Sequence, residues 1–364
     1  MHPVTLPIDS ADGLRMDPKE ARALGSLLAE DYRSADPFPH IVMEGILPEP
    51  LIRKVLEHFP KEKLEEDVVF DIGYGGHHKR QVMPEQCDAF VREFFHFMNS
   101  QPMLQFLEGL TGIDALLPDP YFNGGGFHET SRGGKLGVHA DFRIHEQLNV
   151  QRRINLLIYL NETWDDDWRG QLELWDKSMT ECRARVSPLW NRCVVFSTDA
   201  DTWHGHPDEL LVPEHVKRRS VALYYYTASK NVYNEVPNLS TMYQARPTDD
   251  AAIKKEAREF KTEQYMRDWM PPVLLRGFYR ARRGVAKVAR SLREAGHGRR
   301  RPGQVRRRDA DRQPGRRQNH RHELVALRRR RQQVDGARRH GRSRACGDQR
   351  TTAPAWCPGR IRCG

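Results

Sequence analysis

The stretch GVHADF (137–142) places His139 and Asp141 two positions apart in the chain. In a β-strand, residues i and i+2 point to the same face, so both side chains could reach one metal ion if this stretch is a strand. One carboxylate and two imidazoles leave coordination positions open, which is the facial triad of non-haem Fe(II) oxygenases. The pair therefore indicates a candidate iron site that needs one further histidine.

A second His-x-Asp tripeptide, His206-Pro207-Asp208, occurs in this chain of 16 histidines, so the tripeptide alone decides nothing. The first copy is followed by two candidate third ligands, His204 and His206 in TWHGHP. Few histidines that could act as a third ligand follow the second copy, and its central Pro207 suits a loop better than a paired strand. We therefore interpret the second copy as an incidental pair in a loop.

The hydrophobic pattern changes near residue 119, where short β-rich runs with intervening turn signals begin. Many short strands at roughly regular spacing favour a sandwich or jelly roll over a parallel sheet with crossover helices. These runs are 135–142, 153–161, 171–176, 183–188, 192–198 and 218–227. Outside them, the pattern predicts a short strand within 37–47 and helices over 17–31, 48–59, 84–99 and 249–270.

The net charge of +10 is distributed unevenly. Residues 281–364 hold 26 Lys and Arg against 6 Asp and Glu, whereas residues 1–280 hold 33 basic and 43 acidic residues. An acidic body argues against a domain-wide face for nucleic acid. Beyond residue 295 the composition predicts disorder. Two explanations account for this arginine-rich composition. One is a genuine tail that binds nucleic acid or a membrane surface, and the other is GC-rich sequence translated out of frame. No motif discriminates between them.

Other features exclude several classes of protein. No run approaches the ~18 apolar residues of a membrane span, and the first residues contain no apolar segment of a secretory signal. Cys87, Cys182 and Cys193 lie far apart, without the spacing of a zinc site or a disulfide framework. We therefore expect a cytoplasmic protein without membrane partners.

The region 119–227 resembles the Fe(II)/2-oxoglutarate-dependent dioxygenases, in the branch that includes the prolyl 4-hydroxylases. The resemblance rests on an ordered set: His139-x-Asp141, RINLLIYLN, GQLELWD, RCVVFST, WHG and RRSVALYYYT. It implies a mainly β protein with flanking helices and a double-stranded β-helix (jelly-roll) core. The expected parts are a helical and strand lead-in (1–118), the catalytic core (119–230), a C-terminal helical segment (231–294) and a basic tail (295–364).

The resemblance also implies a set of metal ligands. His139 and Asp141 match the proximal ligands, and His204, in its Trp-His-Gly setting, matches the distal one, with His206 as the alternative. The presence of Asp141 argues against the halogenase variant, which lacks that carboxylate. One departure is Arg169, which precedes Gly170 where family members often have a second glycine.

A 2-oxoglutarate bound to the metal would leave its far carboxylate inside the protein, where it needs a fixed cation, and arginine offers a bidentate fork. The resemblance assigns this role to Arg218. Arg219 is the alternative, because only one of two adjacent strand residues can face inward. Tyr159 and, more weakly, Tyr121 match positions whose hydroxyl contacts 2-oxoglutarate.

The function implied is hydroxylation of a peptidyl or free proline-like residue, or of another small molecule, with release of succinate and CO2. It requires Fe(II), 2-oxoglutarate and O2, with ascorbate as reductant. The sequence does not identify the substrate. Residues 77–80 either line a substrate entrance or form a solvated loop. The alternative is a nucleic-acid-associated protein that acts through its Arg-rich tail and carries a structural or inactive jelly roll.

Truncation near residue 295 should leave the melting temperature nearly unchanged, because a segment without apolar periodicity cannot offset its ordering entropy by burial. Thermal unfolding of the truncated and complete chains, followed by circular dichroism, checks this expectation. A decrease of many degrees would mean that the tail packs on the body.

Overall fold

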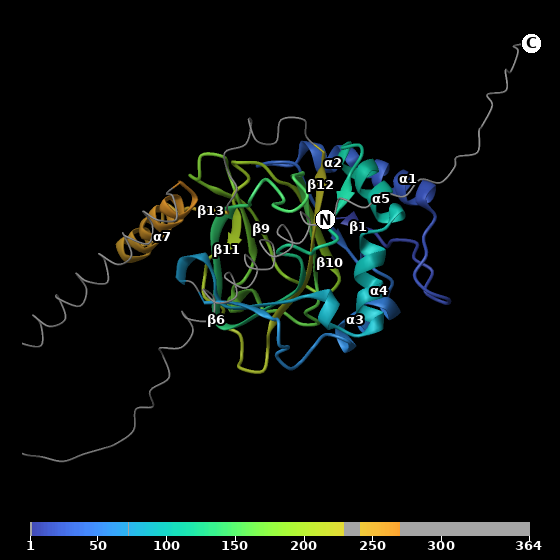
Figure 1. The fold of residues 1–364 in the computed structure, drawn as a ribbon, viewed down its shortest axis with the longest axis horizontal. Coiled ribbons are helices and arrows are strands. Elements are labelled where there is room, and N and C mark those ends of the chain that lie inside the picture. The colour runs from blue at the N-terminus through green and yellow to red at the C-terminus, as the bar shows by residue number, and fades with distance from the viewer. Residues whose placement is uncertain (1, 72, 229–240, 270–364) are drawn as a thin grey trace, which may run out of the picture. The chain divides into compact units, whose positions relative to one another are not determined.

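The computed structural model describes most of the chain up to Trp269, namely residues 2–71, 73–228 and 241–269. The chain divides into two units, Met1–Lys287 and Val288–Gly364, and every described residue belongs to the first (Figure 1). The basic tail beyond residue 295, with its expected disorder, lies outside the described residues. Within the described part, no helix is both long and apolar enough to cross a membrane.

Two sheets share the long strand β6 (Gly126–Ala140). The first half of β6 lies in the major sheet, where the order is β1-β2-β10-β7-β12-β6 and where β4 pairs with the other edge of β6. The second half pairs with β11 and β13 in the minor sheet, which continues through β8 and β9. Two antiparallel sheets linked in this way form a double-stranded β-helix, so the jelly-roll prediction is confirmed.

The major sheet comprises β1 (His2–Pro3), β2 (His40–Glu44), β3 (Val68–Phe70), β4 (His77–Val82), β5 (Leu117–Pro118), β7 (Gln151–Tyr159), β10 (Arg192–Ser197) and β12 (Arg218–Thr227). The minor sheet comprises β8 (Leu172–Trp175), β9 (Cys182–Val186), β11 (His204–His206) and β13 (Met242–Tyr243). The helices are α1 (Pro18–Leu27), α2 (Ala29–Ser34), α3 (Glu49–Glu57), α4 (Ala89–Met98), α5 (Gln101–Thr111) and α7 (Ala251–Trp269).

The side chains of β7 alternate between the two faces of the major sheet. Leu156 and Ile158 belong to the main apolar core, which they form with residues of α3, α4 and α5, the helices on one side of the strands in Figure 1. Leu157 and Tyr159 face the other way and pack with residues of the minor sheet. The inner face of the major sheet continues across the ladder, because Tyr159 lies opposite Ser220 of β12.

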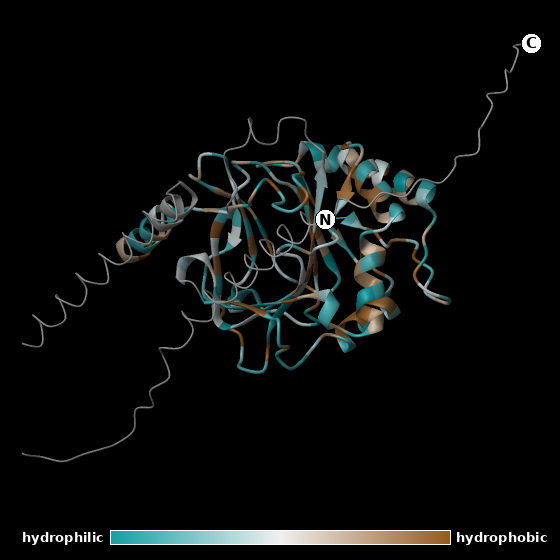
Figure 2. Cartoon of the chain, in the orientation of Figure 1, coloured by the Kyte–Doolittle hydropathy of each residue, from teal (hydrophilic) through white to brown (hydrophobic). Residues whose placement is uncertain are grey.

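Helix α4 begins later than the pattern predicted. The Asp88 carboxylate accepts a hydrogen bond from the Val91 amide at 3.0 Å and caps the helix, while Pro84–Gln86 forms a separate 3₁₀ turn. In Figure 2 the helix carries both brown and teal stretches, as expected for a helix with one buried face. The expected helix over 17–31 is likewise divided at Leu28 into α1 and α2.

Two strands that position the site, β4 and β11, were not predicted. Strand β4 lies in GYGGHHKRQ, where the loop interpretation is wrong, because the segment pairs with β3 on one side and with β6 on the other. Its run of charged and polar residues has no alternating apolar pattern, so the backbone ladder with β6 decides its conformation. Strand β11 has only three residues and gives too short a pattern to read.

Helices α1 and α5 cross in close contact through two glycines. A Cβ added at Gly25 would overlap the carbonyl oxygen of Phe106, and one added at Gly109 would overlap the carbonyl oxygen of Arg22. Both obstacles are backbone atoms, which cannot move without separating the helices. The contact therefore requires glycine at both positions.

Gly25→Ala should destabilise the fold by about 1–3 kcal/mol, because the added methyl group forces α1 away from α5. Leu27→Ala is the matched control in the same helix, since the Leu27 side chain is 80% exposed and its loss should cost less than about 0.5 kcal/mol. Urea unfolding of the two variants measures both values. Equal stabilities would contradict the close crossing.

Candidate metal centre

The structure brings His139, Asp141 and His204 together. His139 lies near the end of β6, Asp141 follows that strand, and His204 of β11 is the direct cross-strand partner of His139. The Asp141 carboxylate lies 3.7 Å from Nε2 of His139 and 3.4 Å from Nε2 of His204. One ligand atom from each residue lies within 4.8 Å of the other two, and all three residues are buried.

Both imidazoles are oriented by the backbone. Nδ1 of His139 donates to the Gly137 carbonyl at 2.8 Å, and Nδ1 of His204 donates to the Thr202 carbonyl at 2.9 Å. With the proton on Nδ1, the Nε2 lone pair of each ring points toward the Asp141 carboxylate, as in metal sites whose histidines are held by outer partners. Burial and the neighbouring His204 lower the pKa of His139 to about 3, so the ring is neutral at neutral pH. This donor set fits a divalent transition metal.

The Asp141 carboxylate is held by two residues of β7. Asn155 donates from Nδ2 to Asp141 Oδ2 at 2.7 Å, and the Arg152 guanidinium lies 3.0 Å from the same oxygen. Arg152 also donates to Asn155 Oδ1 at 2.7 and 2.9 Å, which closes a network of three side chains. Burial alone would raise the pKa of Asp141, but Arg152 and the imidazoles hold it well below its usual value.

Sequence reasoning missed Arg152, although it is one of the largest fully buried side chains. Its guanidinium carbon lies 3.5 Å from the Tyr224 ring centroid and 4.7 Å from that of Phe142, so two aromatic faces hold the cation against the carboxylate. The sequence QRRINLL contains two adjacent arginines, and only the strand register shows which one faces inward.

His206 faces the same interior as His204 but is not part of this group. Its side chain is buried, and its Nδ1 has no hydrogen-bond partner in the part of the chain that the structure describes. Asp208 forms an ion pair with Arg246 at 2.7 Å, outside the group. The tripeptide 206–208 therefore does not bring its own histidine and aspartate into a metal-binding group among the described residues.

The two arginines at the start of β12 point to opposite faces. Arg219 lies on the outer face, where Nε donates to Glu129 at 2.8 Å. Arg218 is buried on the inner face, where it donates to the Gly170 carbonyl at 2.8 Å and to the Tyr159 hydroxyl at 3.3 Å. Among the described residues no carboxylate forms an ion pair with Arg218, and burial lowers its pKa, opposed by Tyr159.

Tyr121 does not lie with Arg218 and Tyr159 on the buried inner face. Its side chain is 53% exposed, and its ring packs near His145 at a centroid distance of 5.7 Å. Tyr159, by contrast, is fully buried beside Arg218.

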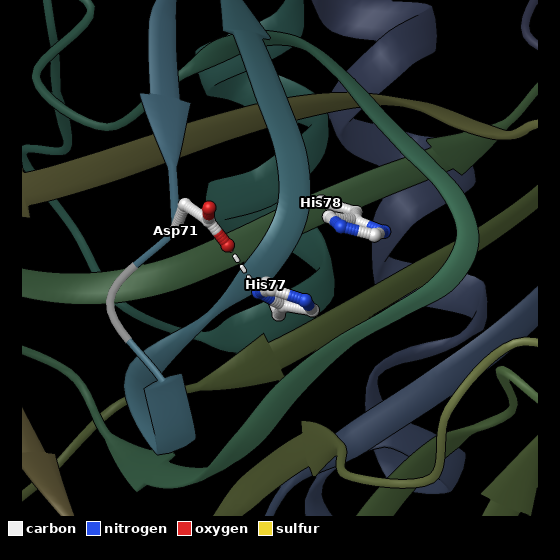
Figure 3. Close-up of side chains that lie close together, drawn as sticks. All are labelled: Asp71, His77 and His78. Carbon is white, nitrogen blue, oxygen red and sulfur yellow. Dashed lines mark ion pairs between the residues drawn. The ribbon is translucent and has the colours of Figure 1, made fainter. Parts of the chain in front are cut away.

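A second group of possible ligands lies at the surface, where β4 begins with His77 and His78 and Asp71 lies close to them (Figure 3). Asp71 forms an ion pair with His77, and the two histidine rings stack at a centroid distance of 3.9 Å. These side chains are exposed or half-exposed, and His78 is bound instead to the Arg132 carbonyl at 3.0 Å. The buried group around Asp141 is the one whose ligands are fixed by surrounding residues.

Comparison with known proteins agrees with this geometry. Residues 125–226 match the family model described as the 2OG-Fe(II) oxygenase superfamily. The match falls within the region 119–227 that carries the resemblance inferred from the sequence, and it confirms that resemblance. None of the curated proteins matches the chain significantly.

Similar solved structures include a prolyl 4-hydroxylase from Pseudomonas putida, which is 20% identical, with 56% of this chain and 100% of that chain covered and a TM-score of 0.41. A prolyl hydroxylase from Trichoplax adhaerens, in complex with a hypoxia inducible factor peptide fragment, is 15% identical, with 57% and 91% covered and a TM-score of 0.39. HygX from Streptomyces hygroscopicus, with nickel and 2-oxoglutarate bound, is 11% identical, with 52% and 83% covered and a TM-score of 0.35.

Alanine at His139, Asp141 or His204 should lower Fe(II) affinity by orders of magnitude, because each change removes one of three ligands. Asp141→Glu should also lose Fe(II) affinity, since the longer side chain misplaces the carboxylate. His206→Ala is the matched control and should retain metal affinity. Anaerobic Fe(II) titration measures all five variants, and a loss in His206→Ala with retention in His204→Ala would reverse the assignment of the third ligand.

Proposed function

We propose that the protein is an Fe(II)- and 2-oxoglutarate-dependent dioxygenase that hydroxylates a small-molecule or peptidyl substrate and releases succinate and CO2. The observation that carries this proposal is a buried His-Asp-His group on the same inner surface as a buried arginine without a carboxylate partner among the described residues. The first feature suits Fe(II), and the second suits the terminal carboxylate of 2-oxoglutarate.

Arg218 fits this role by geometry and by charge. Its Nε and one terminal nitrogen bond neutral acceptors, the Gly170 carbonyl and the Tyr159 hydroxyl, which fix the plane of the guanidinium. The remaining N–H groups can donate to a carboxylate in a bidentate arrangement. Tyr159 would then lie beside the bound carboxylate, where its hydroxyl can donate in turn.

Bound Fe(II) would supply the activation of O2 and the oxidative decarboxylation of 2-oxoglutarate. The chain would supply a fixed geometry and a dry surrounding. Asn155 and Arg152 hold the Asp141 carboxylate, and the Phe196 ring packs edge-on against His204 at a centroid distance of 4.7 Å. Leu172, Leu174 and Val194 belong to the apolar cluster of Phe196 between the two sheets and exclude water from one side of the group.

Two finer parts of this proposal, a proline-like residue as substrate and ascorbate as the reductant, come from the resemblance. The proposed cytoplasmic location comes from the sequence features instead. The dependence of succinate formation on Fe(II) and 2-oxoglutarate, in a screen of candidate metabolites and peptides for oxygen insertion, tests the reaction and identifies the substrate together. Retention of succinate formation after removal of the tail would separate it from the alternative in which the tail carries the function.

Arg218→Ala should weaken 2-oxoglutarate binding about a hundredfold, or on the order of 3 kcal/mol, because it leaves a carboxylate without its cation. Arg218→Lys should raise KM for 2-oxoglutarate less, since it keeps the charge but loses the fork. Arg219→Ala, on the outer face, is the control and should change KM little.

Succinate formation measured against 2-oxoglutarate concentration compares these three variants. A loss confined to Arg219→Ala would show that the assignment to Arg218 is wrong. If neither alanine variant matters, the proposed use of 2-oxoglutarate loses its main support outside the metal ligands.

A further inference from the structure

Lys79 of β4 lies in the same row of the inner face as Arg218. In the sheet register, Lys79 is opposite Thr130 of β6, and Thr130 is opposite Arg218 of β12. Residues directly opposite each other in a sheet project to the same side. The neighbouring Arg80 points the other way, where it donates to the carbonyls of Pro60 at 2.6 Å and Glu62 at 2.8 Å. Lys79 therefore projects toward the interior that contains the metal-binding group.

The Lys79 ammonium has no carboxylate partner. Among the described residues it forms no ion pair, and its Nζ lies over the face of Phe70, 5.1 Å from the ring centroid. Burial, followed by the charge of Arg218, lowers the pKa of Lys79 to about 8, so the ammonium remains mostly charged at neutral pH. A partly buried cation in this position is costly unless an anion compensates it.

The charges of the inner face do not balance. Arg152, Arg218 and Lys79 are three cations, and the carboxylate near them is that of Asp141, which is already bound to Arg152. With a divalent metal bound, the three cations and the metal would carry five positive charges, against which Asp141 and the 2-oxoglutarate dianion supply three negative ones. A second anionic group would reduce this excess.

The position of Lys79 separates it from the site proposed for 2-oxoglutarate. Arg218 leans toward β7, where it bonds the Tyr159 hydroxyl at 3.3 Å. Lys79 lies on the other side of β12, beyond β6. The two cations thus lie on the strands on either side of β6, with Arg218 turned toward β7, and can serve different anions.

His206 adds an independent sign of a ligand on this surface. Its imidazole is buried, and Nδ1 lacks a partner in the described part of the chain. A buried polar atom without a partner needs a ligand or water to satisfy it.

We propose that Lys79 binds an anionic group of the substrate, a carboxylate or a phosphate monoester, so that the enzyme selects an acidic substrate. The proposal rests on the proposed Fe(II)- and 2-oxoglutarate-dependent reaction and deepens it by naming the substrate class. Lys79 is a specificity residue in this account, and the metal ligands and Arg218 operate without it.

The test uses the full chain loaded with Mn(II) and 2-oxoglutarate, which forms the complex without turnover. Acetate and methyl phosphate are the anionic probes, and acetamide and methanol are their neutral counterparts. Paramagnetic relaxation of probe nuclei by Mn(II), titrated against probe concentration and corrected with Mn(II) alone, measures binding near the metal. The variants are Lys79→Met, Lys79→Arg and, as the matched control, Lys63→Met, since Lys63 is an exposed lysine of the lead-in.

At least one anion should bind near the metal, with its affinity lowered about tenfold or more in Lys79→Met, retained in Lys79→Arg and unchanged in Lys63→Met. Preference for acetate or for methyl phosphate identifies the anionic group. Equal binding of anionic and neutral probes by the wild-type chain, or unchanged anion binding in Lys79→Met, would overturn the proposal. So would a loss of 2-oxoglutarate affinity in Lys79→Met as large as that in Arg218→Ala, because Lys79 would then belong to the co-substrate site.

Two controls separate this proposal from the proposed function. If the wild-type chain binds neither Mn(II) nor 2-oxoglutarate, both proposals fail, whereas normal loading with unchanged anion binding in Lys79→Met refutes only the role of Lys79. Thermal unfolding confirms that the variants fold, and Lys79→Met should melt at or above the wild-type temperature, because it removes an uncompensated cation.

Discussion

The Asp141 carboxylate is buried, and a buried charge is tolerated only where other groups compensate it. Asn155 and Arg152 compensate its Oδ2. The His204 imidazole lies beside the same oxygen, and the His139 imidazole lies beside Oδ1. This arrangement requires β6, β7 and β11 to be in register, because each contributes from a fixed position. The jelly roll supplies that register, with β6 passing through both sheets.

The same inner face carries more positive charge than Asp141 can balance. Arg218 and Lys79 lie in one row of the major sheet, and among the described residues neither has a carboxylate partner. A folded protein accepts such cations at a cost in stability, and binding an anion recovers it. The fold therefore favours ligands that bring negative charge to the metal-binding group, which connects its charge distribution to the proposed reaction and to the proposed acidic substrate.

Strand alternation in the sequence was sufficient to pair His139 with Asp141, whereas the choices of His204 over His206 and of Arg218 over Arg219 came from the family resemblance. It was not sufficient for Arg152 and Lys79, whose directions depend on which strand pairs with β6 and in which register. Strand β4 illustrates the limit: HHKRQV has no apolar alternation, and its conformation comes from ladder hydrogen bonds to a distant segment. Long-range pairing of this kind leaves no local signal in the chain.

The most direct measurement of the central claim is anomalous diffraction at the iron edge from crystals grown without oxygen in the presence of Fe(II) and 2-oxoglutarate. The account predicts one iron within coordination distance of Nε2 of both His139 and His204 and of the Asp141 carboxylate, with the far carboxylate of 2-oxoglutarate bound by Arg218. Iron on the surface group of Asp71, His77 and His78 alone, or 2-oxoglutarate bound away from Arg218, would contradict it.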